Sequence, residues 1–210
     1  VYKSKSETSS PTISLEAILL TCMIDAKEGR HVATCDIPGA FMQADIDELI
    51  HIRLEGEIAL LLIRLDESYR QFLTYEGKKK RTPVIYAELN KALYGTLQGA
   101  LLFYKRLSGF LKSQGFTANP YDACVWNREV DGNQCTVGWH VDDLKISHVS
   151  ETVVESVIES LQAEFGREAP LTVTRGLVHD YLGMKIDYST PGSVHIKMDD
   201  YVNKTLAETP

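Results

Sequence analysis

Apolar residues recur at intervals of three and four along three stretches of the chain, which is the spacing of an amphipathic helix. The strongest pattern covers residues 97–114, and Gly115 is expected to end that helix. A second pattern covers residues 151–165. In the third, Ser14 is a candidate N-cap for a helix that runs to about residue 28 and stops at Gly29. The residues expected on the inner faces are Leu101, Tyr104, Leu107, Phe110 and Leu111, then Val154, Val157, Ile158, Leu161 and Phe165, and finally Ile18, Leu19 and Met23.

Shorter apolar segments have the length and composition of strands, at residues 31–36, 49–54, 83–89, 135–140 and 144–148. The last two flank Asp142 and Asp143, which predicts a tight hairpin with the two acids at its tip. A second hairpin is predicted where residues 181–188 and 194–198 face each other across Thr190-Pro191-Gly192. Residues 58–73 have helical spacing and predict a helix between two of the strands, with these side chains inward: Leu61, Leu62, Leu65 and Tyr69.

The order of these elements predicts the fold class. From Cys35 onward it is strand, helix, two hairpin strands, helix and strand. This order is typical of the split βαβ, ferredoxin-like arrangement, set here in a larger sheet of an α+β protein. With 210 residues the chain is long enough for one sizeable domain, and its 44 % hydrophobic and 24 % charged residues are ordinary for a globular protein.

Composition excludes several other classes. No apolar run reaches the roughly 20 residues that span a bilayer, and residues 1–11 are polar and Ser-rich, without the apolar centre of a signal peptide. The four cysteines form no CxxC pair, so buried free thiols are expected rather than a zinc site. The net charge of −7 argues against a protein that coats nucleic acid. A start at Val1 rather than Met suggests a piece of a longer protein.

Three acids are placed for metal chemistry. Asp36 ends one predicted strand, and Asp142 and Asp143 lie at the hairpin tip. In a split βαβ sheet these strands are neighbours, so the three carboxylates are expected to converge. A carboxylate cluster without a cationic partner is costly unless a divalent ion such as Mg²⁺, which prefers oxygen ligands, occupies it. The alternative is ordinary turn chemistry, because Asp is common at hairpin tips for local reasons.

Several motifs, taken in order, favour the metal site. His140-Val-Asp-Asp143 resembles the YxDD box of reverse transcriptases, in the YVDD form of copia-type elements. The segment from Cys35 to Glu48 resembles the first acidic motif of that family, and Leu89-Asn-Lys-Ala-Leu-Tyr-Gly-Thr-Leu-Gln98 resembles its middle motif. The remaining matches are Glu7-Thr-x-x-Pro11, Gly115-Phe, Tyr121-Asp-x-Cys-Val125 and Tyr181-Leu-Gly-Met184. The sequence is therefore similar, over almost its whole length, to the reverse transcriptases of Ty1/copia-type LTR retrotransposons.

The resemblance implies roles for individual residues. Asp36, Asp142 and Asp143 would be catalytic and would bind Mg²⁺, with Mn²⁺ as a substitute and the backbone carbonyl of Ile37 as a further metal ligand. Phe41 would be the steric gate that rejects a 2′-hydroxyl, because a bulky ring under the sugar leaves no room for that oxygen. The other implied contacts are Gln98 and Gly99 with the nucleotide and template, and His140, Leu182, Gly183 and Met184 with the primer. An ordinary core aromatic is the alternative for Phe41, a helix N-cap or a solvent-exposed role for Gln98, and a plain hairpin glycine for Gly183.

The resemblance also implies an organisation and partners. It assigns residues 1–34 and about 49–90 to a fingers-like part, 35–48 and 91–180 to the palm, 181–198 to a primer-grip-like hairpin, and 199–210 to the start of a connection to a thumb. The expected activity is RNA-directed and DNA-directed DNA synthesis, with an RNA template, a DNA primer and dNTPs. Integrase and RNase H segments of the same Pol polyprotein are expected partners, in cytoplasmic virus-like particles and not at a membrane.

The chain departs from the family pattern at two places. His140 replaces the tyrosine of the YxDD box, and Gly99-Ala100 replaces the Ala-Pro that follows the glutamine of copia-type sequences. The basic tip at residues 78–81 is either a phosphate contact or a solvated loop. Two other functions stay open: a decayed copy that only binds nucleic acid, and a metal-dependent phosphodiesterase built on the same acids.

Overall fold

A six-stranded antiparallel sheet forms the body of the protein. It is seen in a computed structural model that describes residues 9–78, 81–96 and 98–208, with backbone only at 200, 201 and 208. The strands follow one another across this sheet in the order β5 (Thr117–Ala118), β6 (Val125–Val130), β7 (Asn133–His140), β8 (Asp143–His148), β1 (His31–Asp36) and β9 (Thr172–Arg175). Strands β7 and β8 form the predicted hairpin, and β1 lies against β8.

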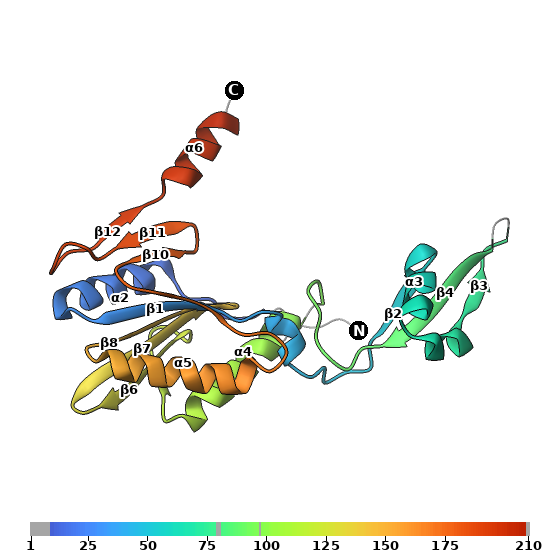
Figure 1. Ribbon diagram of the computed structural model, residues 1–210, viewed down its shortest axis with the longest axis horizontal. Coiled ribbons are helices and arrows are strands. Elements are labelled where there is room, and N and C mark those ends of the chain that lie inside the picture. Colours follow the sequence, from blue (N-terminus) through green and yellow to red (C-terminus); the bar gives the residue numbers. More distant parts are fainter. Residues whose placement is uncertain (1–8, 79–80, 97, 209–210) are drawn as a thin grey trace.

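Helices cover both faces of the sheet. Helices α4 (Gly99–Ser113) and α5 (Glu151–Phe165) lie on one face, and α2 (Leu15–Glu28) lies on the other (Figure 1). The alternation of β8 explains this arrangement, because Leu144 and Ile146 join the apolar core under α4 and α5 while Lys145 points toward α2. Helix α2 begins as predicted, since the Ser14 hydroxyl accepts a hydrogen bond from the Ala17 amide at 3.2 Å.

A buried charged cluster joins α2 to the sheet. Lys145 forms an ion pair with Asp25, and their side chains are 5 % and 1 % exposed. Arg30 lies 4.0 Å from the second oxygen of Asp25, and the Tyr188 hydroxyl donates to Asp25 at 3.4 Å. Burial raises the pKa of Tyr188, and the Asp25 charge raises it further. Two buried charges are tolerated only when they are paired, so this contact fixes how α2 sits on β8.

Two smaller sheets are attached to this body. The first has the order β2 (His51–Glu55), β4 (Thr82–Glu88), β3 (Thr74–Glu76), and it carries the helix α3 (Glu57–Leu65) and the 3-10 helix η2 (Glu67–Phe72). It has its own small core of Ala59, Ile63 and Ile85, and it stands apart from the main sheet (Figure 1). Two antiparallel segments connect it to the body, with a bridge between Asp45 and Lys91 and a hydrogen bond from the Ala92 amide to the Ala44 carbonyl at 3.0 Å.

The third sheet lies beside α2. It contains β10 (Val178–Tyr181), β11 (Met184–Asp187) and β12 (His195–Lys197), and α6 (Asp199–Glu208) extends from it to the end of the described chain (Figure 1). The expected continuous strand at 181–188 is wrong, because Leu182 and Gly183 form a two-residue turn with φ of 52° and 75°. Hairpin pairing between β11 and β12 across Thr190-Pro191-Gly192 is confirmed.

Other sequence expectations meet mixed outcomes. Helix α5 has the predicted bounds, and the four cysteines are free and buried. The single helix expected at 58–73 is wrong, since α3 ends at Leu65 and Leu65 is 78 % exposed. Its fully buried residues are Ala59 and Ile63. Of the residues expected to point inward, Leu62 and Tyr69 pack against this small core, whereas Leu61 and Leu65 are exposed. Met23 is also exposed rather than in the core. None of the described helices is long and apolar enough to cross a membrane.

The buried ion pair gives a prediction about stability. Lys145→Met leaves Asp25 as a buried charge without its main partner, and we expect a loss of about 3–5 kcal/mol in the free energy of unfolding. The double change Asp25→Leu with Lys145→Met removes both charges and should recover most of that loss. Urea unfolding measures both. Glu155→Ala, which breaks the exposed pair with Arg175, is the control and should cost about 1 kcal/mol or less. A Lys145→Met variant as stable as this control would contradict the prediction.

Candidate functional site

The register of β1 and β8 places the predicted acids together. Asp36 is the Cα partner of Asp143, and Asp142 lies in the turn between β7 and β8. The Ile37 amide donates to the Asp142 carbonyl at 3.3 Å, which holds the end of β1 against this turn. Val141 has a φ of 59°, a conformation that is strained for a β-branched residue and that persists only where the surroundings enforce it. The conformation of this turn is therefore imposed by the surrounding fold.

The electrostatics of the acids show how close they are. The pKa of Asp36 and that of Asp143 are both raised, first by burial and second by the negative charge of Asp142. The positive field of His140 lowers the pKa of Asp143 slightly against these effects. Among the described residues no ion pair compensates the three acids. Oxygen ligands that repel one another in this way fit a divalent cation such as Mg²⁺.

The acids do not by themselves form a closed metal cage. Within the described ranges, no three His, Cys, Asp or Glu side chains are grouped so that they could hold a metal ion. One oxygen of Asp142 instead accepts a hydrogen bond from the Tyr94 hydroxyl at 3.0 Å. Burial raises the pKa of Tyr94 to about 12, with the Asp142 hydrogen bond as the next cause, so the phenol remains a donor.

The proposed sugar gate lies next to this hydrogen bond. Phe41, in the 3-10 helix η1 (Ala40–Gln43), stacks on Tyr94 with ring centroids 4.2 Å apart and an interplanar angle of 20°. Gly99, the first residue of α4, packs against the same ring, because a Cβ added there would lie 3.1 Å from Cδ2 of Phe41. A side chain at this position would press on the ring, so a glycine leaves it more space. The structure thus brings Phe41 and Gly99 together near the acids.

Other predicted residues have simpler surroundings. Gln98 stands at the N-cap position of α4, half-buried, and makes no side-chain capping bond to the helix. His140 is half-buried and pairs with Asp143 across the hairpin. Residues 79 and 80 of the basic tip, Leu97 of the middle motif, and the first two residues of the motif at 7–11 lie outside the described residues.

The predicted primer-contact hairpin is bonded to the acidic turn. Leu182 and Gly183 form the turn between β10 and β11, and Met184 is buried at the start of β11. The Tyr181 hydroxyl donates to the Asp143 carbonyl at 3.3 Å, which ties β10 to the start of β8. Sequence reasoning assigned no role to Tyr181 or Tyr94, although both lie inside the motifs that carried the resemblance. The only feature of the sequence that could have indicated these two residues was an aromatic side chain inside each motif.

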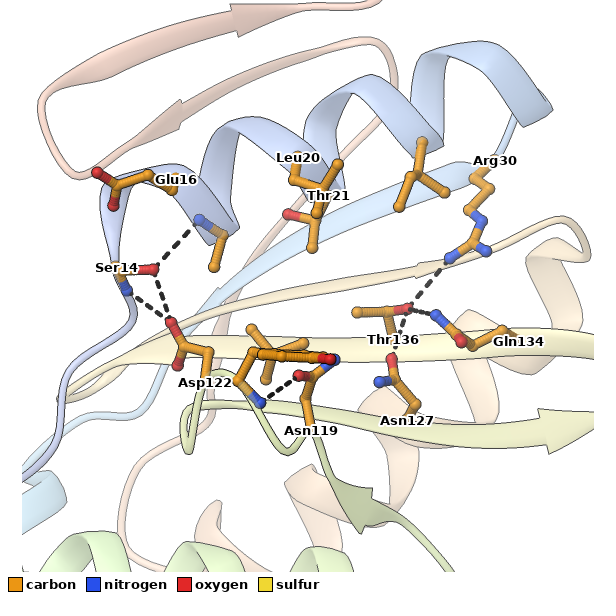
Figure 2. A pocket seen from close by; sticks show the side chains of 14 residues that line it. Ser14, Glu16, Leu20, Thr21, Arg30, Asn119, Asp122, Asn127, Gln134 and Thr136 are labelled. Atoms are coloured by element: carbon orange, nitrogen blue, oxygen red, sulfur yellow. Dashed lines mark hydrogen bonds between the residues drawn. The ribbon is translucent and has the colours of Figure 1, made fainter.

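A hollow of about 500 Å³ lies elsewhere, between α2 and strands β6 and β7. Figure 2 shows that its polar side chains bond to one another, with Asp122 accepting from Ser14 and Arg30 donating to Thr136. The Asp122 oxygens are taken by Ser14 and by the Cys124 amide. This hollow contains none of the predicted site residues.

The fold and the site define a mixed α/β protein with several sheets and an acidic centre on neighbouring strands. The family model described as reverse transcriptase (RNA-dependent DNA polymerase) matches residues 75–209, more than half of the chain. The chain belongs to the reverse transcriptase family. The matched segment contains Asp142 and Asp143 but begins after Asp36.

Two similar proteins are named as transposon proteins. The putative transposon Ty5-1 protein of Saccharomyces cerevisiae is 22 % identical over 174 residues, which cover 83 % of this chain and 49 % of that protein. The retrovirus-related Pol polyprotein from transposon TNT 1-94 of Nicotiana tabacum is 25 % identical over 204 residues, 95 % of this chain and 13 % of the polyprotein. The chain therefore spans about half of one relative and a small part of the other. The resemblance to copia-type reverse transcriptases is confirmed.

The crowded acids lead to a prediction about pH. Their raised pKa values mean that the folded chain binds protons more tightly than the unfolded chain, whose carboxyls titrate near 3.8. Without metal, the contribution of these two carboxyls to stability should therefore increase as the pH falls through their folded pKa values toward 3.8. In Asp142→Asn the pKa of Asp36 and that of Asp143 should both fall, because one negative charge is gone. Carboxyl NMR titration measures this, and unchanged values would contradict the proximity of the three acids.

The contact between Gly99 and Phe41 leads to a second prediction. Gly99→Ala should lower the thermal stability and displace the Phe41 ring, because its Cβ would also lie 2.8 Å from the Thr96 hydroxyl and 3.0 Å from the Leu93 carbonyl. Gly109→Ala in the same helix is the matched control, since no atom lies within 4 Å of its Cβ. That change should stabilise the protein by about 0.5–1 kcal/mol through helix propensity. Thermal unfolding and ring-to-ring NMR contacts between Phe41 and Tyr94 distinguish the two variants, and equal behaviour would contradict the prediction.

Proposed function

We propose that the chain is the catalytic core of an RNA-directed DNA polymerase that transfers nucleotides from dNTPs to a primer 3′-hydroxyl. The observation that carries this proposal is the register that sets Asp36 opposite Asp143 with Asp142 in the adjoining turn. Membership of the reverse transcriptase family supports it. RNA template, DNA primer, integrase and RNase H segments are the proposed partners, in cytoplasmic virus-like particles as expected for a retrotransposon.

In this proposal the main sheet with α4 and α5 is the palm, and its strand order supports the split βαβ arrangement. Strands β7, β8, β1 and β9 are consecutive in the sheet, while α4 and α5 occupy the two crossover positions in the chain. The sheet β2-β4-β3 with α3 is the fingers-like part, and β10-β11-β12 is the primer grip. Segment 199–210 begins the connection to a thumb.

The proposed site residues have distinct tasks. Asp36, Asp142 and the Ile37 carbonyl would hold Mg²⁺ or Mn²⁺, with Asp143 completing the acidic centre. When bound, two such ions would favour ionisation of the 3′-hydroxyl and neutralise the leaving pyrophosphate. Phe41 would exclude a 2′-hydroxyl, and Gly99 would leave the ring the space to do so. Gln98 would contact the nucleotide and template, and His140, Leu182, Gly183 and Met184 would position the primer.

A nucleic-acid-binding module without catalysis is the second candidate. One observation favours it, namely that no three potential ligands of the described residues are grouped for a metal. Against it stands the electrostatic cost of keeping Asp36, Asp142 and Asp143 together. A module that only bound phosphates would gain from cations at this place, not from three acids.

Primer extension on an RNA template tests the polymerase proposal. The chain is assayed alone and fused to the segments that flank the equivalent region of a retrotransposon Pol relative, with Mg²⁺ and with Mn²⁺. We expect extension by at least the fused form, and a loss of about 10³-fold or more in Asp142→Asn, because a metal ligand is removed. Salt-dependent binding of primer–template with no extension by either form would overturn the proposal and favour the binding module.

A further inference from the structure

Tyr94 lies between the proposed sugar gate Phe41 and the proposed metal ligand Asp142. Its hydroxyl donates to Oδ2 of Asp142 at 3.0 Å, and its ring stacks on Phe41 at 4.2 Å between centroids. With 58 % of its surface exposed, Tyr94 is not held there by burial in the core. Its place follows instead from specific contacts, so the residue can be changed without opening a core cavity.

The backbone around Tyr94 fixes this position. The Ala92 amide bonds to the Ala44 carbonyl at 3.0 Å, and Lys91 pairs with Asp45 at 2.5 Å, so the segment before Tyr94 is fastened to the segment after Phe41. After Tyr94, the chain turns sharply at Gly95, which has a φ of 90°, and the Thr96 amide and hydroxyl both donate to the Leu93 carbonyl. The backbone segments that carry the two rings therefore hold the rings against each other.

Phe41 has neighbours on more than one side. Tyr94 stacks on its ring, and Gly99 lies on another side, where an added Cβ would come within 3.1 Å of Cδ2. A steric gate rejects a hydroxyl only when it cannot move aside. Gly99 and Tyr94 together prevent the Phe41 ring from moving aside. Of these two neighbours, only Tyr94 does so with a side chain.

The hydrogen bond to Asp142 leaves part of that carboxylate available. An ionised carboxylate has two oxygens with about four acceptor positions, and the Tyr94 hydroxyl uses one of them on Oδ2. Carboxylates that bind metals are commonly oriented by such an outer hydrogen bond, and loss of the bond typically weakens metal binding by about 10- to 100-fold. The Tyr94 hydroxyl thus has the geometry of an orienting group for Asp142.

We propose that Tyr94 is a positioning residue with two separable tasks: its ring supports Phe41 against a ribonucleotide, and its hydroxyl orients Asp142 for the cation. The inference rests on the proposed polymerase function for its first task, and on the acidic site alone for its second. It predicts that one side chain links sugar selection to metal binding.

The hydroxyl is tested by metal binding to the chain without substrate. Free Mn²⁺ is measured by electron paramagnetic resonance in titrations of the wild type, Tyr94→Phe and Tyr86→Phe. Tyr86 is the matched control, an exposed tyrosine whose hydroxyl donates to Glu76 at 3.1 Å on the sheet β2-β4-β3. We expect Tyr94→Phe to weaken Mn²⁺ binding by about 10-fold or more and Tyr86→Phe to leave it unchanged. Unchanged or tighter binding in Tyr94→Phe would overturn the orienting role.

The ring is tested by the selectivity between dNTP and rNTP, as the ratio of their kcat/KM values in the fused form. Tyr94→Phe keeps the ring and should keep this ratio, whereas Tyr94→Leu should lower it by roughly 10-fold or more. In a Phe41→Val background the change Tyr94→Leu should add little, because residues that act through one contact are not additive. An unchanged ratio in Tyr94→Leu would overturn the supporting role.

The two arms separate this inference from the proposed function. Wild-type protein that binds Mn²⁺ but extends no primer would contradict the polymerase, and the Mn²⁺ titration would still decide the role of the hydroxyl. Wild-type protein that extends primers with full sugar selectivity, alongside Tyr94 variants identical to it, would contradict the role of Tyr94 alone.

Discussion

The site depends on the antiparallel register between β1 and β8. This register sets Asp36 opposite Asp143, and the Ile37 amide then reaches the Asp142 carbonyl. A slip by one residue would turn every side chain of β1 to the other face of the sheet. The acids would then separate, and apolar residues of β1 that are now buried in the core would face the buried charged cluster under α2. Packing on both faces therefore selects the same register that brings the three acids together.

Strand β8 serves the site and the core with alternate residues. Asp143 begins the strand at the acidic centre, Leu144 enters the core, and Lys145 pairs with Asp25 under α2. The Tyr181 hydroxyl bonds to the Asp143 carbonyl, so β10 is tied directly to β8. The Tyr188 hydroxyl bonds to Asp25, so the residue after β11 is linked to Lys145 through Asp25. Loss of the buried ion pair would thus disturb the seat of α2 and of the third sheet together.

The sequence predicts those parts of the fold that repeat a simple period. Helix α5 and strand β1 have the expected bounds because their apolar spacing and flanking residues agree. Leu61 and Leu65 of α3 mislead because they are exposed, on a small sheet whose buried core consists of Ala59, Ile63 and Ile85. The burial of Asp25 could not be predicted from the hydrophobic pattern, because it depends on an ion pair with a lysine that is distant in the chain. Tyr94 was inside a recognised motif, but its contacts with Phe41 and Asp142 exist only in three dimensions.

The connection to the sheet β2-β4-β3 ends directly at the proposed nucleotide site. Its two segments are paired at Ala44 and Ala92, and each continues within three residues to one of the stacked rings, Phe41 or Tyr94. In the proposed function, a displacement of that sheet would bend the paired segments or reach the rings, because these segments join the sheet to the body. The hydroxyl of Tyr94 extends the same chain of contacts to Asp142. In the proposed function, a movement of the fingers-like part, the selection of the sugar and the orientation of a metal ligand would be mechanically connected through this one pair of antiparallel segments.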